Sequence, residues 1–462
     1  MSRSTRASTR GASLINTAAF HEVFDLTDPG SNIVFDMSLE EARSRVESGD
    51  TSRVREIDGH FAIVARCGQM VRMARSLQVP MRYFIVKKSA GPALLVAHRI
   101  DEIQRWLEEH GLGDQFHPTY TRMVPAHYIT EIALVGCPDP NPTYQRFFAP
   151  AREVLPDDLT SIAERYIGAL AAEIRKWLER LPQEEPIGVS FSGGIDSGAV
   201  FLVLYHQMCE LGLDLGRLKA FTLSIGPAGA DLEQARRFLA DLDLQLFHEP
   251  IEVPLDYVDL HQAIRVIEDY KPLDIQSGAM TLALCRKIRE RYPTWRYLAD
   301  GDGGDENLKD YPIEENPELT IRSVLGNLML YHEGWGVDSI KHSLTYSGGL
   351  SRGCTRGYAP MRHYGFRGFS PFTIPNVIEV SEGIPFIALT DWDHQRLYDL
   401  KGEIVSRGVR ALTGLTMPTF EKRRFQDGVA TNGLLGTRFP ASPAVYRSAF
   451  QLICDERTSA IR

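Results

Sequence analysis

The residues of this chain best suited to chemistry form a Ser-Gly-Gly-Ile-Asp-Ser run at positions 192–197, directly after the largely apolar run 187–191. Such an apolar run is typical of a parallel strand buried on both faces. The paired glycines let backbone N–H groups face an anion at the N-terminus of the next helix. We therefore predict a strand, a phosphate-binding loop and a helix, rather than an ordinary glycine turn with a Ser/Asp cap. The predicted binding residues are Ser190, Ser192, Gly193, Gly194, Asp196 and Ser197.

A second reactive segment, Asp-Gly-Asp-Gly-Gly-Asp-Glu, occupies residues 300–306 and follows a predicted strand at 296–299. Carboxylates in a glycine-rich loop suit a hard cation, because Mg²⁺ takes one or two carboxylates together with phosphate oxygens and water. We predict that Asp196 from the first loop and Asp305 from the second hold Mg²⁺. The alternative for the second loop, taken alone, is a solvated acidic turn.

Residues 339–378 contain no acidic side chain and several arginines interleaved with aromatic residues. Arginine is suited to bidentate capture of a carboxylate. The stretch therefore indicates a pocket for an acidic substrate, with Arg356 and Arg367 as the candidate ligands. A basic surface loop explains the same composition equally well.

Alternating strand and helix patterns surround the two loops and must position them. Apolar residues recur at three- and four-residue steps over 159–181, which predicts a helix with one buried face. Beyond the phosphate loop we expect a strand at 219–225, a helix at 231–242 and a strand at 244–248. This order predicts an α/β fold with a doubly wound parallel sheet, whose ligands lie beyond the carboxyl ends of the strands. From about residue 312 the pattern becomes helical.

The first 150 residues contain short β-rich runs separated by turn residues. They predict a smaller sheet-rich domain at 1–150, followed by the larger α/β domain at 151–462. The Ser/Arg-rich first ten residues favour a disordered tail over a transit peptide. The predicted strands lie at 32–35, 60–66, 70–74, 82–86 and 93–97.

Composition excludes several classes of protein. The 462 residues are 43% hydrophobic and 24% charged, with a net charge of −9, so a basic surface for nucleic acid is not expected. No apolar run approaches the ~20 residues that span a bilayer. The six cysteines form no CxxC pair, which favours reduced, structural thiols and a cytoplasmic protein. A homodimer is compatible with these features.

Three motifs resemble those of a known family. The run at 192–197 resembles the pyrophosphate loop of ATP pyrophosphatases, which convert ATP to an adenylate and pyrophosphate. Residues 301–306 resemble the "G-E-G-S-D-E" of asparagine synthetases, and residues 422–429 resemble their "K-x-x-F-x-D-G-V". The resemblance, over about residues 55–435, is to the asparagine synthetase and β-lactam synthetase family. It implies an adenine nucleotide alpha-hydrolase-like synthetase domain that uses ATP and Mg²⁺.

The resemblance also implies roles for individual residues. Ser224 and Gly301 match positions at the nucleotide site, and Lys422 matches the family's active-site lysine. Asp302 stands where asparagine synthetases have Glu and β-lactam synthetases have Tyr. We expect Asp302 to orient or deprotonate the attacking amine, a role in which geometry counts before pKa.

The N-terminal half resembles the glutaminase half of asparagine synthetases, an N-terminal-nucleophile hydrolase. Residues 58–64 and 80–84 are similar to that family's "G-x-F-A" and "P-L-Y-Y" stretches. Those glutaminases use a cysteine exposed at the N-terminus as nucleophile, whereas here Met1 is followed by Ser2. We therefore expect a degenerate domain without glutaminase activity.

Together these features predict a ligase that adenylates a small-molecule or peptide carboxylate and passes the acyl group to ammonia or an amine. The nitrogen could come from free ammonia, from the same molecule, as in biosynthetic cyclases, or from a second molecule. One alternative is a sulfurtransferase acting on tRNA, which usually needs a reactive cysteine pair and a basic face. The other is a non-catalytic nucleotide-binding paralogue, against which Asp196, Asp302, Asp305 and Lys422 argue together.

Overall fold

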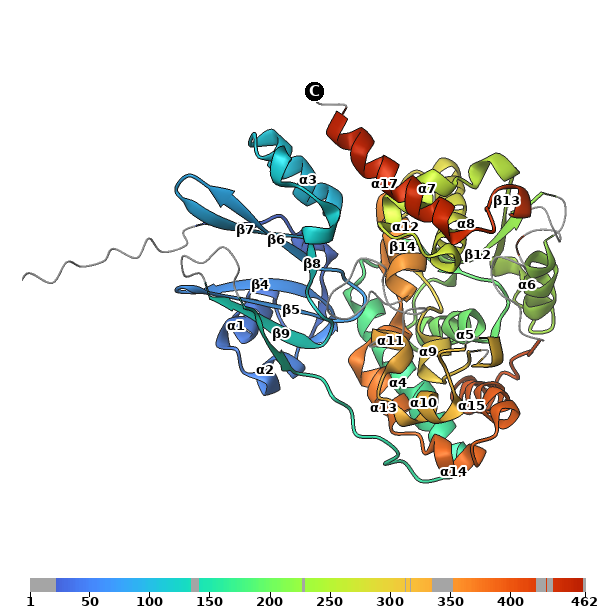
Figure 1. Ribbon diagram of the computed structural model, residues 1–462. Helices are drawn as coiled ribbons and strands as arrows, with labels where there is room; N and C mark the ends of the chain where they lie inside the picture. The colour runs from blue at the N-terminus through green and yellow to red at the C-terminus, as the bar shows by residue number, and fades with distance from the viewer. Residues whose placement is uncertain are drawn as a thin grey trace, which may run out of the picture.

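The structure is a computed structural model that describes residues 22–133, 141–226, 229–311, 313–315, 317–334, 352–420, 429 and 435–459. A β-rich N-terminal part packs against a larger α/β part (Figure 1). Residues 147–158 join the two parts and contain neither helix nor strand. The change from the β-rich part to the α/β part therefore falls within these residues.

The N-terminal part has four layers. Two four-stranded sheets, ordered β1-β7-β6-β8 and β10-β9-β5-β4, face each other across one apolar core. Helix α3 covers the outer face of the first sheet, and α1 and α2 cover the second (Figure 1). The first sheet comprises β1 (Glu22–Asp25), β7 (Gly91–Ala97), β6 (Arg82–Lys88) and β8 (Arg122–Met123). The second comprises β10 (Thr143–Arg146), β9 (Tyr128–Ala133), β5 (Met70–Arg75) and β4 (Ala62–Cys67). The helices are α1 (Leu39–Ser48), α2 (Thr51–Arg55) and α3 (Ile100–Glu109), and β2 (Ile33–Phe35) pairs with β3 (Asp58–His60).

A five-stranded sheet, ordered β13-β12-β11-β14-β15, organises the α/β part, and all its neighbouring strands are parallel. The first strand in sequence, β11, is therefore central, and the chain adds strands on one side before crossing to the other. Loops that follow β11 and β14 meet where the strand order reverses, which is the usual ligand site of such sheets. The strands are β11 (Ile187–Ser190), β12 (Leu218–Ile225), β13 (His248–Val253), β14 (Tyr297–Ala299) and β15 (Arg367–Phe369).

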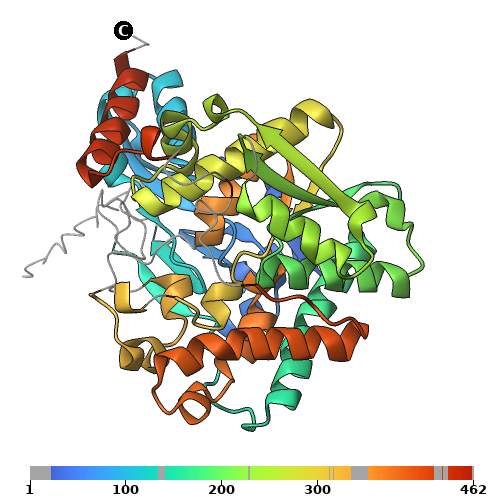
Figure 2. The same ribbon diagram turned by 90° about the vertical axis from the view of Figure 1, so that its right-hand side faces the viewer.

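Helices cover both faces of this sheet. One face packs on a core built from α4, α5, α6, α13 and α15, and the other on a core built from α7, α8, α12 and α17. The long α15 packs across α4 (Figure 2). The first group is α4 (Leu159–Arg180), α5 (Ile195–Glu210), α6 (Ala230–Ala240), α13 (Pro375–Glu382) and α15 (His394–Thr413). The second is α7 (Leu260–Ile267), α8 (Pro272–Arg291), α12 (Ala359–His363) and α17 (Pro443–Ser459). Shorter helices are α9 (Gly304–Asn307), α10 (Ile321–Gly326), α11 (Leu330–Glu333) and α14 (Phe386–Thr390).

The predicted fold class is confirmed: the α/β part is a doubly wound parallel sheet with a helical C-terminal region, preceded by a smaller β-rich part. Two details of the prediction are wrong. The strand expected at 244–248 begins only at His248, because Gln245–Phe247 forms a 3₁₀ turn after Asp243, whose φ is +57°. The region beyond 312 also contributes a strand, β15, at the edge of the sheet.

Over the part of the chain that the structure describes, no helix combines the length and the apolar character needed to cross a membrane.

Candidate active site

The phosphate loop lies between β11 and α5, as predicted. Gly193 adopts a φ of +72°, and a Cβ there would lie 2.9 Å from the backbone N of Ala235 in α6. Glycine is therefore required both by the turn and by the approach of α6. Helix α5 has Gly194 at its N-cap and no side-chain cap. Its first N–H groups are thus available to an anion such as a phosphate.

Two serine hydroxyls brace the loop. The Oγ atoms of Ser192 and Ser197 lie 3.2 Å apart, and the backbone N–H of Gly194 donates to Ser192 Oγ at 3.3 Å. The N–H of Ser192 donates to Ser197 Oγ at 3.3 Å. These hydroxyls hold the loop in shape around the end of α5, and Ser190 closes the strand before it.

The acidic loop packs directly onto the phosphate loop. It follows β14 and leads into α9, and a Cβ at Gly301 would lie 2.7 Å from the backbone N of Ser197. A Cβ at Gly304 would collide with the carboxylate of Asp196. Glycines at both positions therefore allow the two loops to touch, which brings Asp305 toward Asp196.

A lysine that the sequence analysis did not identify links the two loops. Lys401, on α15, is only 3% exposed, and its Nζ lies 2.6 Å from Asp196 Oδ2 and 3.3 Å from Asp310 Oδ2. It also forms an ion pair with Asp305 Oδ1. Asp196 and Asp305, predicted as metal ligands, are thus brought together as expected, with an ammonium between them.

Burial alone would lower the pKa of Lys401, but the carboxylates of Asp196, Asp305 and Asp310 outweigh it and raise the pKa well above its usual value. Lys401 is therefore a fixed positive charge. It contacts Oδ2 of Asp196 and Oδ1 of Asp305, and each carboxylate has a second oxygen. Two carboxylates on adjoining loops beside an uncapped helix N-terminus are a donor set that fits Mg²⁺ bound to phosphate oxygens.

Asp302 lies on the other side of the acidic loop, paired with Asp300. The backbone N–H of Asp302 donates to Asp300 Oδ1 at 3.0 Å. The π-helix η8 (Cys354–Tyr358) presses on the Asp302 carboxyl, because a Cβ at Gly357 would collide with Asp302 Oδ2. Burial raises the pKa of Asp300 to about 7. Burial, followed by the charges of Asp300 and Glu306, raises the pKa of Asp302 well above its usual value.

A carboxyl group with a pKa of about 7, such as that of Asp300, can hold or release a proton near neutral pH. The arrangement therefore combines a glycine loop at an uncapped helix N-terminus, a pair of carboxylates bridged by a lysine, and a separate pair of buried acids.

The two predicted substrate arginines occupy different places. Arg356 lies in η8 beside the acidic loop, and its Nε and Nη2 donate to Asp274 Oδ1, each at 2.8 Å. Arg367 is the first residue of β15, which pairs in parallel with β14. The acidic loop lies at the other end of these two strands, where the Asp300 N–H donates to Phe369 O at 3.1 Å. Arg367 is exposed, with its guanidinium 5.9 Å from the Tyr297 ring centroid. The structure therefore brings Arg356, but not Arg367, to the site.

The remaining predicted residues lie along the edge of the sheet or outside the described residues. Ser224 is fully buried near the carboxyl end of β12 and accepts the N–H of Gly229 at 3.2 Å. Lys422 lies outside the described residues. Val429, at the end of the same motif, accepts the N–H of Ile225 at 2.8 Å, so the motif ends beside the carboxyl end of β12.

One part of the chain matches a known protein family. Residues 173–343 match the family model described as asparagine synthase. They include both loops but exclude Lys401 and Arg356. No curated protein sequence matches the chain. The NH3-dependent NAD synthetase from Campylobacter jejuni subsp. jejuni NCTC 11168, solved with nitrate, shares 16% identity. The alignment covers 57% of this chain and 99% of that one, with a TM-score of 0.23, so this likeness adds nothing to the strand order described here.

Proposed function

We propose that this chain, whose residues 173–343 belong to the asparagine synthase family, is an ATP-dependent ligase that forms amide bonds. In this proposal a substrate carboxylate attacks the α-phosphorus of ATP, and pyrophosphate leaves. Ammonia or an amine then attacks the acyl-adenylate, and AMP leaves. The observation that carries the proposal is the contact between the phosphate loop and the acidic loop, bridged by Lys401.

The phosphate loop would bind the triphosphate. Its backbone N–H groups and the N-terminus of α5 would hold the pyrophosphate before and after the P–O bond breaks. Asp196 and Asp305 would hold Mg²⁺, which supplies positive charge for the phosphate oxygens when bound. The ammonium of Lys401 lies 2.6 Å from Asp196, so it would offset the repulsion between the two carboxylates and lie close to the same phosphates.

Asp302 would serve the second half of the reaction. The amine becomes acidic as its nitrogen bonds to the acyl carbon, and the Asp302 carboxylate would accept the released proton. The raised pKa of Asp302, due first to burial, makes its carboxylate a stronger proton acceptor than an ordinary aspartate. The charge of Arg356 acts on Asp302 in the opposite direction and favours the ionised form.

The proposal is tested by screening carboxylic acids and amines for conversion of ATP to AMP, with products identified by mass spectrometry. Asp305→Asn should abolish AMP formation in the presence of Mg²⁺ because a neutral amide is a poor ligand for a hard cation. Asp399→Asn, an exposed change on α15, is the matched control and should retain activity. Equal activity in both variants would remove the acidic loop from the mechanism.

Two other results would favour the alternative functions. AMP formation that depends on tRNA and on no carboxylic acid would indicate a sulfurtransferase. Binding of MgATP with no turnover for any acid or amine would indicate a nucleotide-binding paralogue without catalysis.

A further inference from the structure

A glutamine of the N-terminal part reaches the acidic loop of the synthetase part. Gln78 lies between β5 and β6 and has no exposed surface. Its Nε2 donates to Ser370 Oγ at 3.0 Å, and its Oε1 lies 3.3 Å from the Thr373 hydroxyl, which donates to the Ser370 carbonyl at 2.8 Å. Both partners belong to the segment that follows β15, so the contact crosses between the two parts of the chain.

Ser370 continues this contact to the acid pair. The Ser370 side chain moderates the rise in the Asp300 pKa that burial causes, and Phe369, the residue before it, accepts the backbone N–H of Asp300 at 3.1 Å. Asp300 Oδ1 in turn accepts the backbone N–H of Asp302 at 3.0 Å. Contacts therefore lead from Gln78 to Ser370, from the adjoining Phe369 to Asp300, and from Asp300 to Asp302.

The amide of Gln78 is the donor in its contact with Ser370 Oγ. A serine hydroxyl has a single hydrogen, and with Oγ accepting from Gln78 that hydrogen remains available to a neighbour such as Asp300, whose pKa the Ser370 side chain lowers. A carboxylate at position 78 has no hydrogen to donate, so it would compete for the Ser370 hydrogen.

Gln78 also lies close to Asp302 in space. Gly353, immediately before η8, separates the two: a Cβ there would be 3.1 Å from Asp302 Cβ and 3.5 Å from Gln78 Oε1. The same glycine therefore packs against the predicted base and against the glutamine of the other part.

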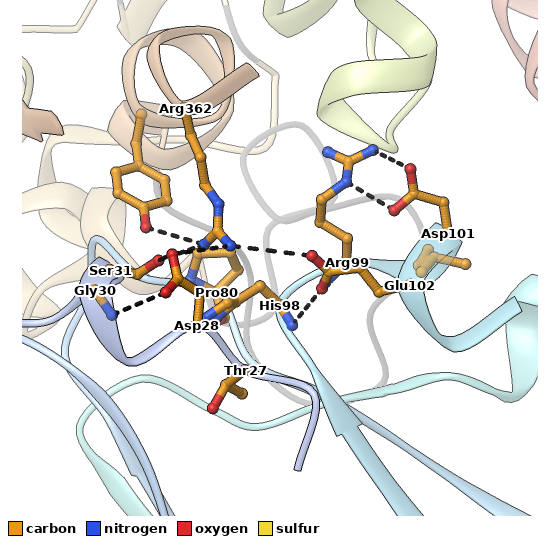
Figure 3. A network of polar contacts seen from close by, with 12 residues as sticks. Thr27, Asp28, Gly30, Ser31, Pro80, His98, Arg99, Asp101, Glu102 and Arg362 are labelled. Carbon is orange, nitrogen blue, oxygen red and sulfur yellow. Dashed lines mark hydrogen bonds and ion pairs between the residues drawn. The ribbon is translucent and has the colours of Figure 1, made fainter. Parts of the chain in front are cut away.

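Charged side chains hold the interface that carries Gln78 at a second place. Arg362 of α12 donates to Ser31 Oγ at 2.7 Å and lies 3.8 Å from Asp28 Oδ2, both in the N-terminal part (Figure 3). Arg99 donates to the carbonyl of Val266 at 2.6 Å. In return, the Glu268 carboxylate accepts the N–H groups of Ile100 and Asp101 at 2.8 and 2.9 Å at the start of α3. These contacts fix the position from which Gln78 approaches the site.

We propose that Gln78 is a positioning residue for the Asp300–Asp302 pair, so that the N-terminal part completes the synthetase active site. The role of Gln78 in catalysis rests on the proposed function, in which Asp302 accepts the proton of the amine. The contact between Gln78 and the acid pair is independent of that function, and it can be measured in protein without substrate.

The first measurement is hydrogen–deuterium exchange of peptides covering residues 297–310, followed by mass spectrometry. Gln78→Ala should raise exchange at the Asp302 amide, because the carboxylate that accepts it loses its support. Ser370→Ala breaks the same contact from the other side of the interface and should have the same effect, which keeps the test valid if Gln78→Ala does not fold. The double variant should exchange no faster than the faster single variant, because the two changes remove one interaction. Gln104→Ala is the matched control, since Gln104 is a buried glutamine of the same part that donates to Glu108 within α3.

The second measurement separates kcat from KM. Misplacement of a catalytic group by about 1 Å can cost on the order of a hundredfold in rate, so Gln78→Ala should lower kcat about tenfold or more with the KM for ATP nearly unchanged. Gln78→Glu should be impaired at least as strongly, because its carboxylate reverses the Ser370 hydrogen bond. Gln104→Ala should keep the wild-type kcat.

Each outcome bears on the proposal. Faster exchange and lower kcat in the Gln78 and Ser370 variants alone would support it. Wild-type exchange at the acidic loop in these variants, or an equal effect of Gln104→Ala, would overturn it. If the wild-type protein forms no AMP from any acid, the proposed function fails, while the exchange data still decide whether Gln78 holds the acid pair.

Discussion

Replacement of Lys401 by methionine is the most direct test of the charge arrangement at the site. Methionine keeps most of the length of the side chain and removes only the ammonium that lies between Asp196, Asp305 and Asp310. Three carboxylates would then face one another without the buried positive charge. We expect the unliganded protein to lose stability and to acquire a strong response to divalent cations.

The size of the effect follows from the burial of Lys401, which is 3% exposed. Removing one partner of a buried ion pair typically costs about 3–5 kcal/mol, because the remaining charge stays buried without compensation. At about 2–4 °C per kcal/mol, the Tm should fall by roughly 6–20 °C. A cation that binds only the folded variant at a hundred times its Kd would restore about 2.7 kcal/mol.

The assay is thermal unfolding with and without MgCl₂ in the absence of nucleotide. Lys309→Met is the matched control, because Lys309 is 4% exposed and pairs with Glu382 at 3.2 Å. Both variants should be destabilised, but only Lys401→Met should be rescued by Mg²⁺, since a divalent cation can replace its ammonium between Asp196 and Asp305. An unchanged Tm in Lys401→Met, or equal rescue of both variants, would refute this account of the site.

Three further predictions concern the nitrogen source, the C-terminal motif and pH. We expect ammonia or an amine to be used directly, so glutamine should release no glutamate during turnover; glutamate formed at the rate of AMP would assign a glutaminase to the N-terminal part. Lys422→Ala should leave ATP affinity nearly intact and lower kcat on the order of a hundredfold. Lys422→Arg should restore little of the lost kcat, because the planar guanidinium is not a compact charge. Wild-type kcat in the alanine variant would remove Lys422 from the site. Since burial raises the pKa of Asp300 to about 7, the folded protein binds an extra proton below that pH, and this stabilisation is lost as the pH rises through about 7. Asp300→Asn should therefore show a smaller fall in Tm than wild type between about pH 5 and pH 8, and parallel profiles would contradict the assignment.

The parallel sheet could be predicted because its signals are local. Strands buried on both faces read as apolar runs, and the glycines that end β11 and β14 are required by contacts such as that of Gly193 with α6. The strand expected at 244–248 was misplaced because apolar residues there do not all face the core: Leu246 is 90% exposed. Hydrophobicity alone could not reveal the 3₁₀ turn that delays β13.

The position of a side chain within a charged stretch was harder to predict. Arg356 and Arg367 have the same composition around them, yet η8 turns Arg356 toward Asp274, while Arg367 begins an edge strand. Only the pairing of β15 with β14 decides which of them approaches the acidic loop. That pairing joins segments far apart in the sequence and leaves no local pattern.

Lys401 was missed, although the sequence does carry a signal for it. It is 205 positions from Asp196, so no motif links the two. It lies, however, in the buried stripe of α15, between Leu397 and Leu400 on one side and Ile404 on the other. A lysine in such a stripe is expected only where an anion is buried with it. The carboxylates of Asp196 and Asp305 in the two loops are the anions that accompany Lys401.

The ammonium of Lys401 also explains how the carboxylates of Asp196 and Asp305 can lie close together before MgATP binds. Without it, Asp196 and Asp305 would repel each other across adjoining loops, and part of the binding energy of MgATP would be consumed in bringing them together. With it, the two carboxylates are already held near the N-terminus of α5, 2.6 Å from a positive charge in the case of Asp196. Charges fixed before the reaction need no reorganisation as the transition state forms, and such preorganisation is usually the largest electrostatic contribution to catalysis. On this argument, Lys401→Met rescued in stability by Mg²⁺ should still turn over slowly, because one cation between Asp196 and Asp305 cannot supply both the charge of the lost ammonium and the charge that the phosphates need.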